Sequence, residues 1–257
     1  MTTILNIENH IAIITFNRPE SSNAVNRELL SSFLKNLQEV SNNSSVRVLF
    51  LQGAGNKVFC AGADLKERAT MSEKEVIQFL DMFRYTCSYL ENISLPTVCV
   101  LNGDAYGGGL EIALCCDLRI MANEAKIGLT ETKLGIIPGA GGTQRLSRLI
   151  GVSRAMELIF SARRIDSEKA FQLGIVNSIA DRSNLSALTQ SYAEEISSSA
   201  PIAVRMAKKA IKNGFTQDLN NALDMERACY LQTLKTKDRN EALTAFKEKR
   251  KPNFIGE

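Results

Sequence analysis

A glycine-rich segment, residues 102–111 (NGDAYGGGLE), carries the clearest chemical signal in this chain. It follows an apolar, strand-like run and leads into IALCC, a run suited to a buried helix. Three consecutive glycines, Gly107 to Gly109, remove side chains where the backbone enters that helix, so a guest can reach its free N–H groups directly. The helix dipole favours an anionic guest. Close packing of the helix on a strand explains the same glycines equally well.

Two glutamates occupy positions that call for an explanation. Glu111 lies one turn into the helix among Leu110, Ile112 and Ala113, where a buried carboxylate is costly unless it is paired or functional. Glu131 lies in IGLTETKLGIIP, just before a second glycine-rich segment at residues 137–143 (IPGAGGT). An ordinary surface acid in a loop is one interpretation of Glu131, and a second functional acid is the other.

A third segment, residues 59–66 (FCAGADLK), reads as a loop of small residues directly after an apolar strand. Asp64 is predicted to be the N-cap of the helical run that follows. That geometry would leave the backbone N–H of Ala63 exposed as a donor.

Residue counts exclude several classes of chemistry. His10 is the only histidine, so catalysis by a Ser-His-Asp or Cys-His arrangement would depend on it, and an HExxH zinc site is impossible. No Gly-Lys dipeptide occurs, which removes the nucleotide-binding P-loop, and neither glycine-rich segment contains GxGxxG. The six cysteines form no CxxC pair and are expected to be reduced core residues. The net charge of +3 gives no electrostatic sign of nucleic-acid binding.

The order of elements indicates an α/β fold. The 257 residues suffice for one large domain or two small ones. Short apolar runs at residues 11–16, 46–51 and 97–101 predict strands, and apolar residues with helical spacing between 25 and 37 and between 76 and 83 predict helices. This alternation favours largely parallel strands.

Beyond about residue 185 the pattern is helical throughout. Pro201 is expected to open a helix that stops at Gly214, and two more helical stretches follow near 218–233 and 237–249. We therefore predict a core domain that carries the active site over residues 1–185 and a helical C-terminal region over 186–257. The N-terminus lacks a signal-peptide pattern and no stretch is apolar enough to cross a membrane, so we expect a cytoplasmic protein without a membrane partner.

Three motifs together resemble a known family. FCAGADLKE, AYGGGLEIALCCD and GLTETKLGIIPGAGGTQRL are similar, in order and spacing, to the signature stretches of the enoyl-CoA hydratase/isomerase family, the crotonases, and the resemblance extends over the whole chain. It implies a crotonase-like (ClpP/crotonase) α/β fold, with a spiral core of repeated ββα units and a helical C-terminal extension.

The resemblance also implies a mechanism. The N–H groups of Ala63 and Gly108 would form an oxyanion hole around a thioester carbonyl, and Glu111 and Glu131 would hold a water between them above the substrate double bond. Because both acids are present, hydration of a 2-trans-enoyl-CoA is favoured over double-bond isomerisation, which often needs only the later acid. Coenzyme A belongs to the acyl-CoA thioester substrate, and no cofactor or metal is implied.

The same resemblance implies substrate contacts and assembly. Backbone groups near Ala61, Ala63 and Leu65 would meet coenzyme A, and basic side chains such as Lys66 and those of the C-terminal tail could meet its phosphates. The predicted substrate and coenzyme A site comprises Ala61, Ala63, Asp64, Leu65, Lys66, Gly107, Gly108, Pro138 and Gly139. A homo-oligomer, a trimer or dimer of trimers, is expected to form through the C-terminal helices, and the same region would close the coenzyme A pocket.

Within the family, DLKERATMSEKEV, ELIFSARRID, ACYLQT and TKDRNEALTAFKEKR resemble methylglutaconyl-CoA hydratases, a branch with an RNA-binding member. Such a substrate carries a distal carboxylate, so a cation should line the acyl pocket, although the sequence does not identify it. Hydration of an ordinary short-chain enoyl-CoA is the alternative. Only Arg27 and Lys35 are cationic on the helix face that binds RNA in that relative, with Ser31 between them, and we expect no specific RNA binding. A catalytically silent scaffold is the remaining alternative.

Overall fold

Ten strands form two sheets in the computed structural model, which describes residues 1–257. The six-stranded sheet has the order β1-β2-β3-β5-β7-β10, and the four-stranded sheet has the order β4-β6-β8-β9. Neighbouring strands are parallel except for the pairs β1–β2 and β8–β9. The strands are β1 (Thr3–Glu8), β2 (Ile11–Phe16), β3 (Val48–Gly53), β4 (Val58–Cys60), β5 (Thr97–Leu101), β6 (Asp104–Tyr106), β7 (Leu118–Ala122), β8 (Lys126–Gly128), β9 (Ile165–Asp166) and β10 (Ser178–Ala180).

Eleven α-helices and two short 3-10 helices connect or extend these strands. They are α1 (Arg27–Asn42), α2 (Leu65–Arg68), α3 (Glu73–Asn92), α4 (Gly108–Cys115), α5 (Gly142–Ile150), α6 (Val152–Ser161), α7 (Ser167–Gln172), α8 (Leu185–Ser197), α9 (Pro201–Gly214), α10 (Leu219–Thr233), α11 (Lys237–Glu248), η1 (Pro19–Ser21) and η2 (Glu131–Leu134).

The chain spirals between the two sheets. β3, β5 and β7 lie side by side in the larger sheet, and the strand that follows each of them, β4, β6 or β8, joins the smaller sheet. Each pair then leads to helices, α2 and α3 after the first, α4 after the second, and η2 and α5 after the third. The predicted repetition of ββα units is therefore confirmed.

Two predicted strands, residues 11–16 and 97–101, match β2 and β5. The third prediction, residues 46–51, is wrong by two residues at each end, because β3 pairs in parallel with β2 from Ile11 opposite Val48 to Phe16 opposite Gly53. All five residues of β5 are buried, as expected for a parallel strand covered on both faces.

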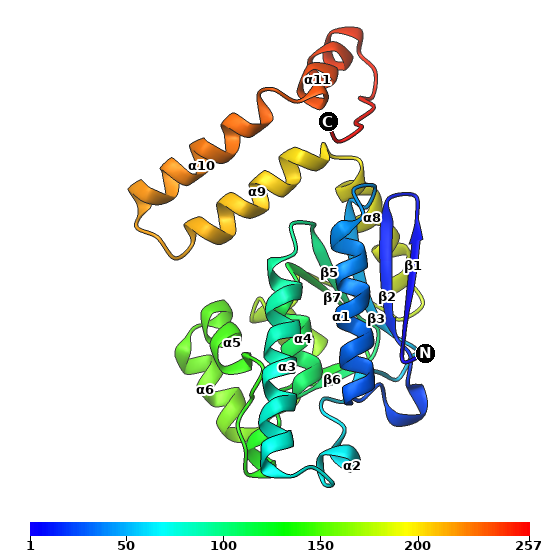
Figure 1. The fold of residues 1–257 in the computed structure, drawn as a ribbon, viewed down its shortest axis with the longest axis vertical. Helices are drawn as coiled ribbons and strands as arrows, with labels where there is room; N and C mark the ends of the chain where they lie inside the picture. Colours follow the sequence, from blue (N-terminus) through cyan, green and yellow to red (C-terminus); the bar gives the residue numbers. More distant parts are fainter.

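Helices α1 and α3 pack on this core and on each other (Figure 1). Asn26 caps α1, and Ser72 and Glu75 form a capping box at the start of α3. The run inferred from apolar spacing over residues 76–83 falls inside α3. The run 25–37 begins two residues too early for α1, because Asn26 caps the helix and Val25 pairs with Ala63 in a β-bridge. The six cysteines are all buried, which confirms the prediction that they are core residues, and they form no disulfide in this structure.

The chain beyond residue 185 is helical, as predicted. α8 packs against β3, β7 and β10, whereas α9 and α10 form a pair that projects away from the sheets and leads to α11 at the top of Figure 1. α9 begins at Pro201 and ends at Gly214, as their types indicate. None of the helices combines the length and apolarity required to cross a bilayer.

Candidate active site

Each of the segments that carry Ala63, Gly108 and Glu131 contains the end of one of three neighbouring strands. β4, β6 and β8 are adjacent and parallel in the smaller sheet, so their carboxyl ends lie at one edge. Ala63 follows β4, Gly108 follows β6, and Glu131 follows β8. The spiral thereby brings together residues that are far apart in the sequence.

The backbone N–H groups of Ala63 and Gly108 lie close together without backbone acceptors. A Cβ added to Gly108 would lie 3.6 Å from the nitrogen of Ala63, and a Cβ added to Gly62 would lie 3.2 Å from the nitrogen of Gly108. Gly62 and Gly107 have φ of 97° and 51°, a region that side chains disfavour. Two adjacent free donors, one at the start of α4, suit a developing oxyanion.

Glu111 is buried, with its side chain fixed by backbone donors. Oε1 accepts hydrogen bonds from the N–H groups of Ala140 at 2.8 Å and Gly142 at 2.7 Å. Burial raises the pKa of Glu111, and the two amide hydrogen bonds oppose this rise. The carboxylate expected to be paired or functional is thus held by the second glycine-rich segment.

Glu131 is only 8% exposed, so its interpretation as a surface acid is wrong. Neither carboxylate oxygen has a hydrogen-bond partner. Burial raises the pKa of Glu131 to about 7, and the negative charge of Glu111 adds to the rise. A Cβ added to Gly107 would lie 3.2 Å from Oε1 of Glu131, which places this carboxyl group beside the start of α4.

A groove of about 690 Å³ lies beside the candidate site, and its lining includes Tyr106 and Thr130, the chain neighbours of Gly107 and Glu131. Two of the predicted coenzyme A contacts, Ala61 and Leu65, line it. Tyr106 lines it as well, with its hydroxyl donating to Asp104 at 2.8 Å and the guanidinium of Arg164 at 4.3 Å from the centre of its ring. The other lining residues are Lys133, Leu134, Ser161, Ala162, Arg163 and Arg164.

The remaining predicted contacts are spread around the site. Asp64 caps α2 as predicted, accepting from the N–H groups of Lys66 and Glu67, and it pairs with Arg18 at 3.0 Å. The side chain of Lys66 is exposed. Pro138 is buried, and a Cβ added to Gly139 would lie 2.9 Å from Leu80. The substrate roles of these residues stay predictions.

Three residues at the site were missed by sequence reasoning. Phe83 on α3 packs against Gly108, where an added Cβ would lie 2.8 Å from its ring, and Leu80 of the same helix faces Gly139. The apolar spacing of α3 was the available signal, but it did not indicate which neighbour the helix covers. Arg145 contacts the segment that binds Glu111, and only its place after the glycines hinted at this.

His10 lies in the turn between β1 and β2, exposed, with Nδ1 2.8 Å from the carbonyl oxygen of Ser45. This fits its expected non-catalytic role. No group of three or more His, Cys, Asp or Glu side chains has a metal-binding arrangement.

The arrangement is suited to proton transfer beside a developing negative charge, because two buried carboxyl groups flank a pair of free amides. A family model for enoyl-CoA hydratase/isomerase matches residues 6–257. The chain therefore belongs to the enoyl-CoA hydratase/isomerase family. The predicted crotonase-like fold is confirmed by a crystal structure of an enoyl-CoA hydratase from Bacillus anthracis, which is 46% identical, with a TM-score of 0.98 and full coverage of both chains.

Two curated relatives illustrate the range of the family. An enoyl-CoA isomerase/hydratase of Mycosarcoma maydis is 46% identical over 252 residues, covering 95% of this chain and 92% of the relative. The mitochondrial methylglutaconyl-CoA hydratase of Homo sapiens is 43% identical over 251 residues, covering 96% of this chain and 74% of the relative.

Proposed function

We propose that the chain is an enoyl-CoA hydratase, which adds water across the double bond of a 2-trans-enoyl-CoA to give a 3-hydroxyacyl-CoA. The observation that carries the proposal is the pair of buried glutamates beside the free N–H groups of Ala63 and Gly108. Isomerisation alone would require only one of the two acids.

The oxyanion pair acts on the thioester. When a water oxygen bonds to the β-carbon, the double-bond electrons move toward the thioester carbonyl and form an enolate. The N–H groups of Ala63 and Gly108 stabilise that charge, and one such donor is typically worth roughly 2.7–4 kcal/mol in the transition state.

The glutamates divide the proton transfers. Two amide hydrogen bonds favour the ionised form of Glu111, so it accepts the proton of the attacking water. The pKa of Glu131 is raised to about 7 by burial and by the charge of Glu111, so this residue holds a proton near neutral pH and delivers it to the α-carbon. The reverse reaction exchanges the two roles.

Purified protein and crotonyl-CoA test the proposal through the loss of the enoyl-thioester absorbance. Glu111→Gln and Glu131→Gln should each lower turnover by about 10²–10⁴-fold, because the amide cannot exchange a proton. Glu20→Gln, at an exposed position, is the matched control. Near-normal turnover in a folded Glu111→Gln or Glu131→Gln variant would remove that residue from the mechanism. If Glu111→Gln still isomerises a 3-enoyl-CoA while wild-type protein hydrates nothing, the isomerase alternative stands instead.

The acyl group proposed for this site has a distal carboxylate, as in the substrate that names the methylglutaconyl-CoA hydratases. Arg68 is the cation that we propose to bind this carboxylate. Its guanidinium lies 5.9 Å from the ring centre of Phe79, which contacts Phe83, and Phe83 packs against Gly108. Arg68 forms no ion pair with an acid of the chain.

Comparison of kcat/KM for 3-methylglutaconyl-CoA and crotonyl-CoA tests this assignment. Arg68→Met should lower the first value by about tenfold or more and leave the second within about twofold, because a charge-assisted hydrogen bond is worth about 1.5–3 kcal/mol. Equal effects on both substrates would favour the ordinary short-chain alternative.

A homo-oligomer is also proposed, supported by apolar side chains that the C-terminal helices leave exposed. The most exposed of them are Ile211, Phe215, Leu219 and Phe246, each more than 70% accessible. Sedimentation equilibrium should give a trimer or a dimer of trimers, and Phe246→Glu should weaken it. A monomer at micromolar concentration would contradict the proposal.

Specific RNA binding and a cofactor are not part of the proposed function. On the α1 face considered for RNA, Arg27 pairs with Glu75 at 3.3 Å, which leaves less positive charge for phosphate. Salt-dependent retention of RNA by the protein at physiological ionic strength would contradict this exclusion of RNA binding. Activity should survive dialysis against a chelator, because the proposed steps use only Glu111, Glu131 and backbone donors.

A further inference from the structure

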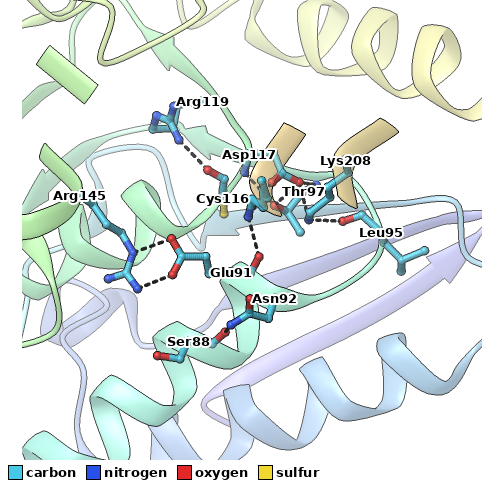
Figure 2. Close-up of polar contacts among 11 residues, drawn as sticks. Ser88, Glu91, Asn92, Leu95, Thr97, Cys116, Asp117, Arg119, Arg145 and Lys208 are labelled. Atoms are coloured by element: carbon cyan, nitrogen blue, oxygen red, sulfur yellow. Dashed lines mark hydrogen bonds and ion pairs between the residues drawn. The ribbon is translucent and has the colours of Figure 1, made fainter. Parts of the chain in front are cut away.

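Arg145, on α5, joins the second glycine-rich segment to α3. Its Nε and Nη2 donate to the two carboxylate oxygens of Glu91 at 3.0 and 2.7 Å, a forked ion pair drawn in Figure 2. Its Nη1 donates to the carbonyl oxygen of Ala140 at 2.8 Å. The guanidinium therefore connects a helix of the core to one peptide of the glycine-rich segment.

That peptide, Ala140–Gly141, lies between the two peptides whose N–H groups bind Glu111. The N–H groups of Ala140 and Gly142 both donate to Oε1 of Glu111, and Gly141 lies between them with φ of 108°. A Cβ added to Gly141 would collide with Nη1 of Arg145, so the backbone of the second glycine-rich segment packs directly against the guanidinium. One side of the segment thus holds Glu111, and Arg145 holds the other.

We propose that Arg145 is a positioning residue for Glu111 and that Glu91 is its anchor. The inference rests on the proposed function for its kinetic consequence. By fixing the Ala140–Gly142 peptides, Arg145 keeps both amide donors on Oε1 of Glu111 and leaves the second oxygen for the attacking water.

The charges around Glu111 support this role. Arg145 from α5 favours the ionised carboxylate of Glu111, whereas Glu131 from η2 opposes it only when Glu131 is itself ionised. Cys115, on α4 itself, donates its thiol hydrogen to the backbone oxygen of Glu111 at 3.1 Å. Glu91 binds Arg145, so its effect on the carboxylate of Glu111 is carried by that guanidinium. Loss of the guanidinium should therefore raise the pKa of Glu111 and loosen its orientation together.

The alternative is that the Arg145–Glu91 ion pair only stabilises the packing of α3 on α5. Kinetic measurements distinguish this structural role from the positioning of Glu111. Arg145→Met should lower kcat for crotonyl-CoA by about tenfold or more with KM within about twofold, because the lost interaction acts on the proton transfer rather than on binding. Arg145→Lys, which keeps the charge without the fork, should retain part of the activity. Glu91→Gln should fall between wild type and Arg145→Met.

A double-variant comparison gives the decisive readout. In a Glu111→Gln background, Arg145→Met should change kcat by less than about twofold, because residues that act as a unit are not additive. Equal fold-losses in both backgrounds, or a folded Arg145→Met with wild-type kcat, would overturn the inference. Urea unfolding of each variant shows which are folded, and Arg145→Lys and Glu91→Gln carry the test if Arg145→Met is not.

A second measurement does not depend on hydratase activity. Infrared titration of the folded protein should show a carboxyl band that disappears in Glu111→Gln, and Arg145→Met should move the midpoint of that band to higher pH. An unchanged midpoint would overturn the positioning role. If wild-type protein hydrates no enoyl-CoA while the midpoint still shifts, the proposed function fails and the positioning role stands.

Discussion

Glu131, the proton donor in the proposed reaction, should reduce the stability of the folded chain at alkaline pH. Its carboxyl oxygens are buried without partners, and burial raises its pKa to about 7 from an ordinary value of 4.5. Below pH 4.5 the group is protonated in both the folded and the unfolded chain. Above pH 7 it is ionised in both, and the folded chain then bears the full penalty of the buried charge.

The size of the effect follows from the pKa difference. One pKa unit corresponds to about 1.4 kcal/mol, so the shift from 4.5 to about 7 sets a ceiling of about 3.4 kcal/mol. Glu131→Gln removes this titration. The free energy of burying the amide does not depend on pH and so does not affect the comparison. The difference in unfolding free energy between variant and wild type should therefore move by about 3 kcal/mol in favour of the variant from pH 4 to pH 8.5.

Urea unfolding at a fixed protein concentration measures this difference across the pH range. The exposed Glu20→Gln serves as the control and should show no such drift. In parallel, kcat/KM of the wild type should show an inflection near pH 7 that Glu131→Gln lacks. A difference between Glu131→Gln and wild type that stays constant with pH would refute the buried, unpaired state of this carboxyl group.

Three further outcomes are expected. Gly108→Val should abolish acyl-CoA binding measured by calorimetry, because its side chain would meet Phe83 and the oxyanion donors, and unchanged affinity would count against that geometry. Cys60 should resist iodoacetamide at pH 8 in the native protein and react after denaturation, because burial raises its pKa to about 12, and mass spectrometry would detect native labelling if this is wrong. Asp64→Ala should lower the urea midpoint by an amount worth about 1–2 kcal/mol, since it loses both the α2 cap and the Arg18 ion pair, whereas an unchanged midpoint would show that neither contributes.

Local chemistry explains which parts of the fold were predictable from the sequence. Pro201 and Gly214 bracket α9, and Asp64 caps α2, because these residue types act on the backbone within a turn of their own position. The bounds of β3 were missed because they depend on pairing with β2, a strand much earlier in the chain. Strand ends are set by such partners rather than by the strand's own residues.

The residues of the candidate site likewise differ in how far local sequence predicts them. Glu111 stood out because an acid in an apolar helix is anomalous in the sequence itself. For Glu131 the residues alone left a surface acid and a functional acid as alternatives, since its burial arises only when η2 folds against the start of α4. The role proposed for Glu131 came from the resemblance to family motifs. The fork of Arg145 on Glu91 joins residues 54 positions apart and is visible only in three dimensions.

The smaller sheet also has a kinetic consequence for folding. Its parallel strands β4, β6 and β8 have three residues each, and every one contributes a different part of the site. Parallel pairings between segments distant in the chain form slowly, since each must close a long loop first. A refolding chain that has formed only the first ββα units would therefore bury much of its core before Glu131 is placed beside Gly107. Recovery of enzymatic activity should accordingly lag behind recovery of secondary structure, so that turnover reports the last step of folding.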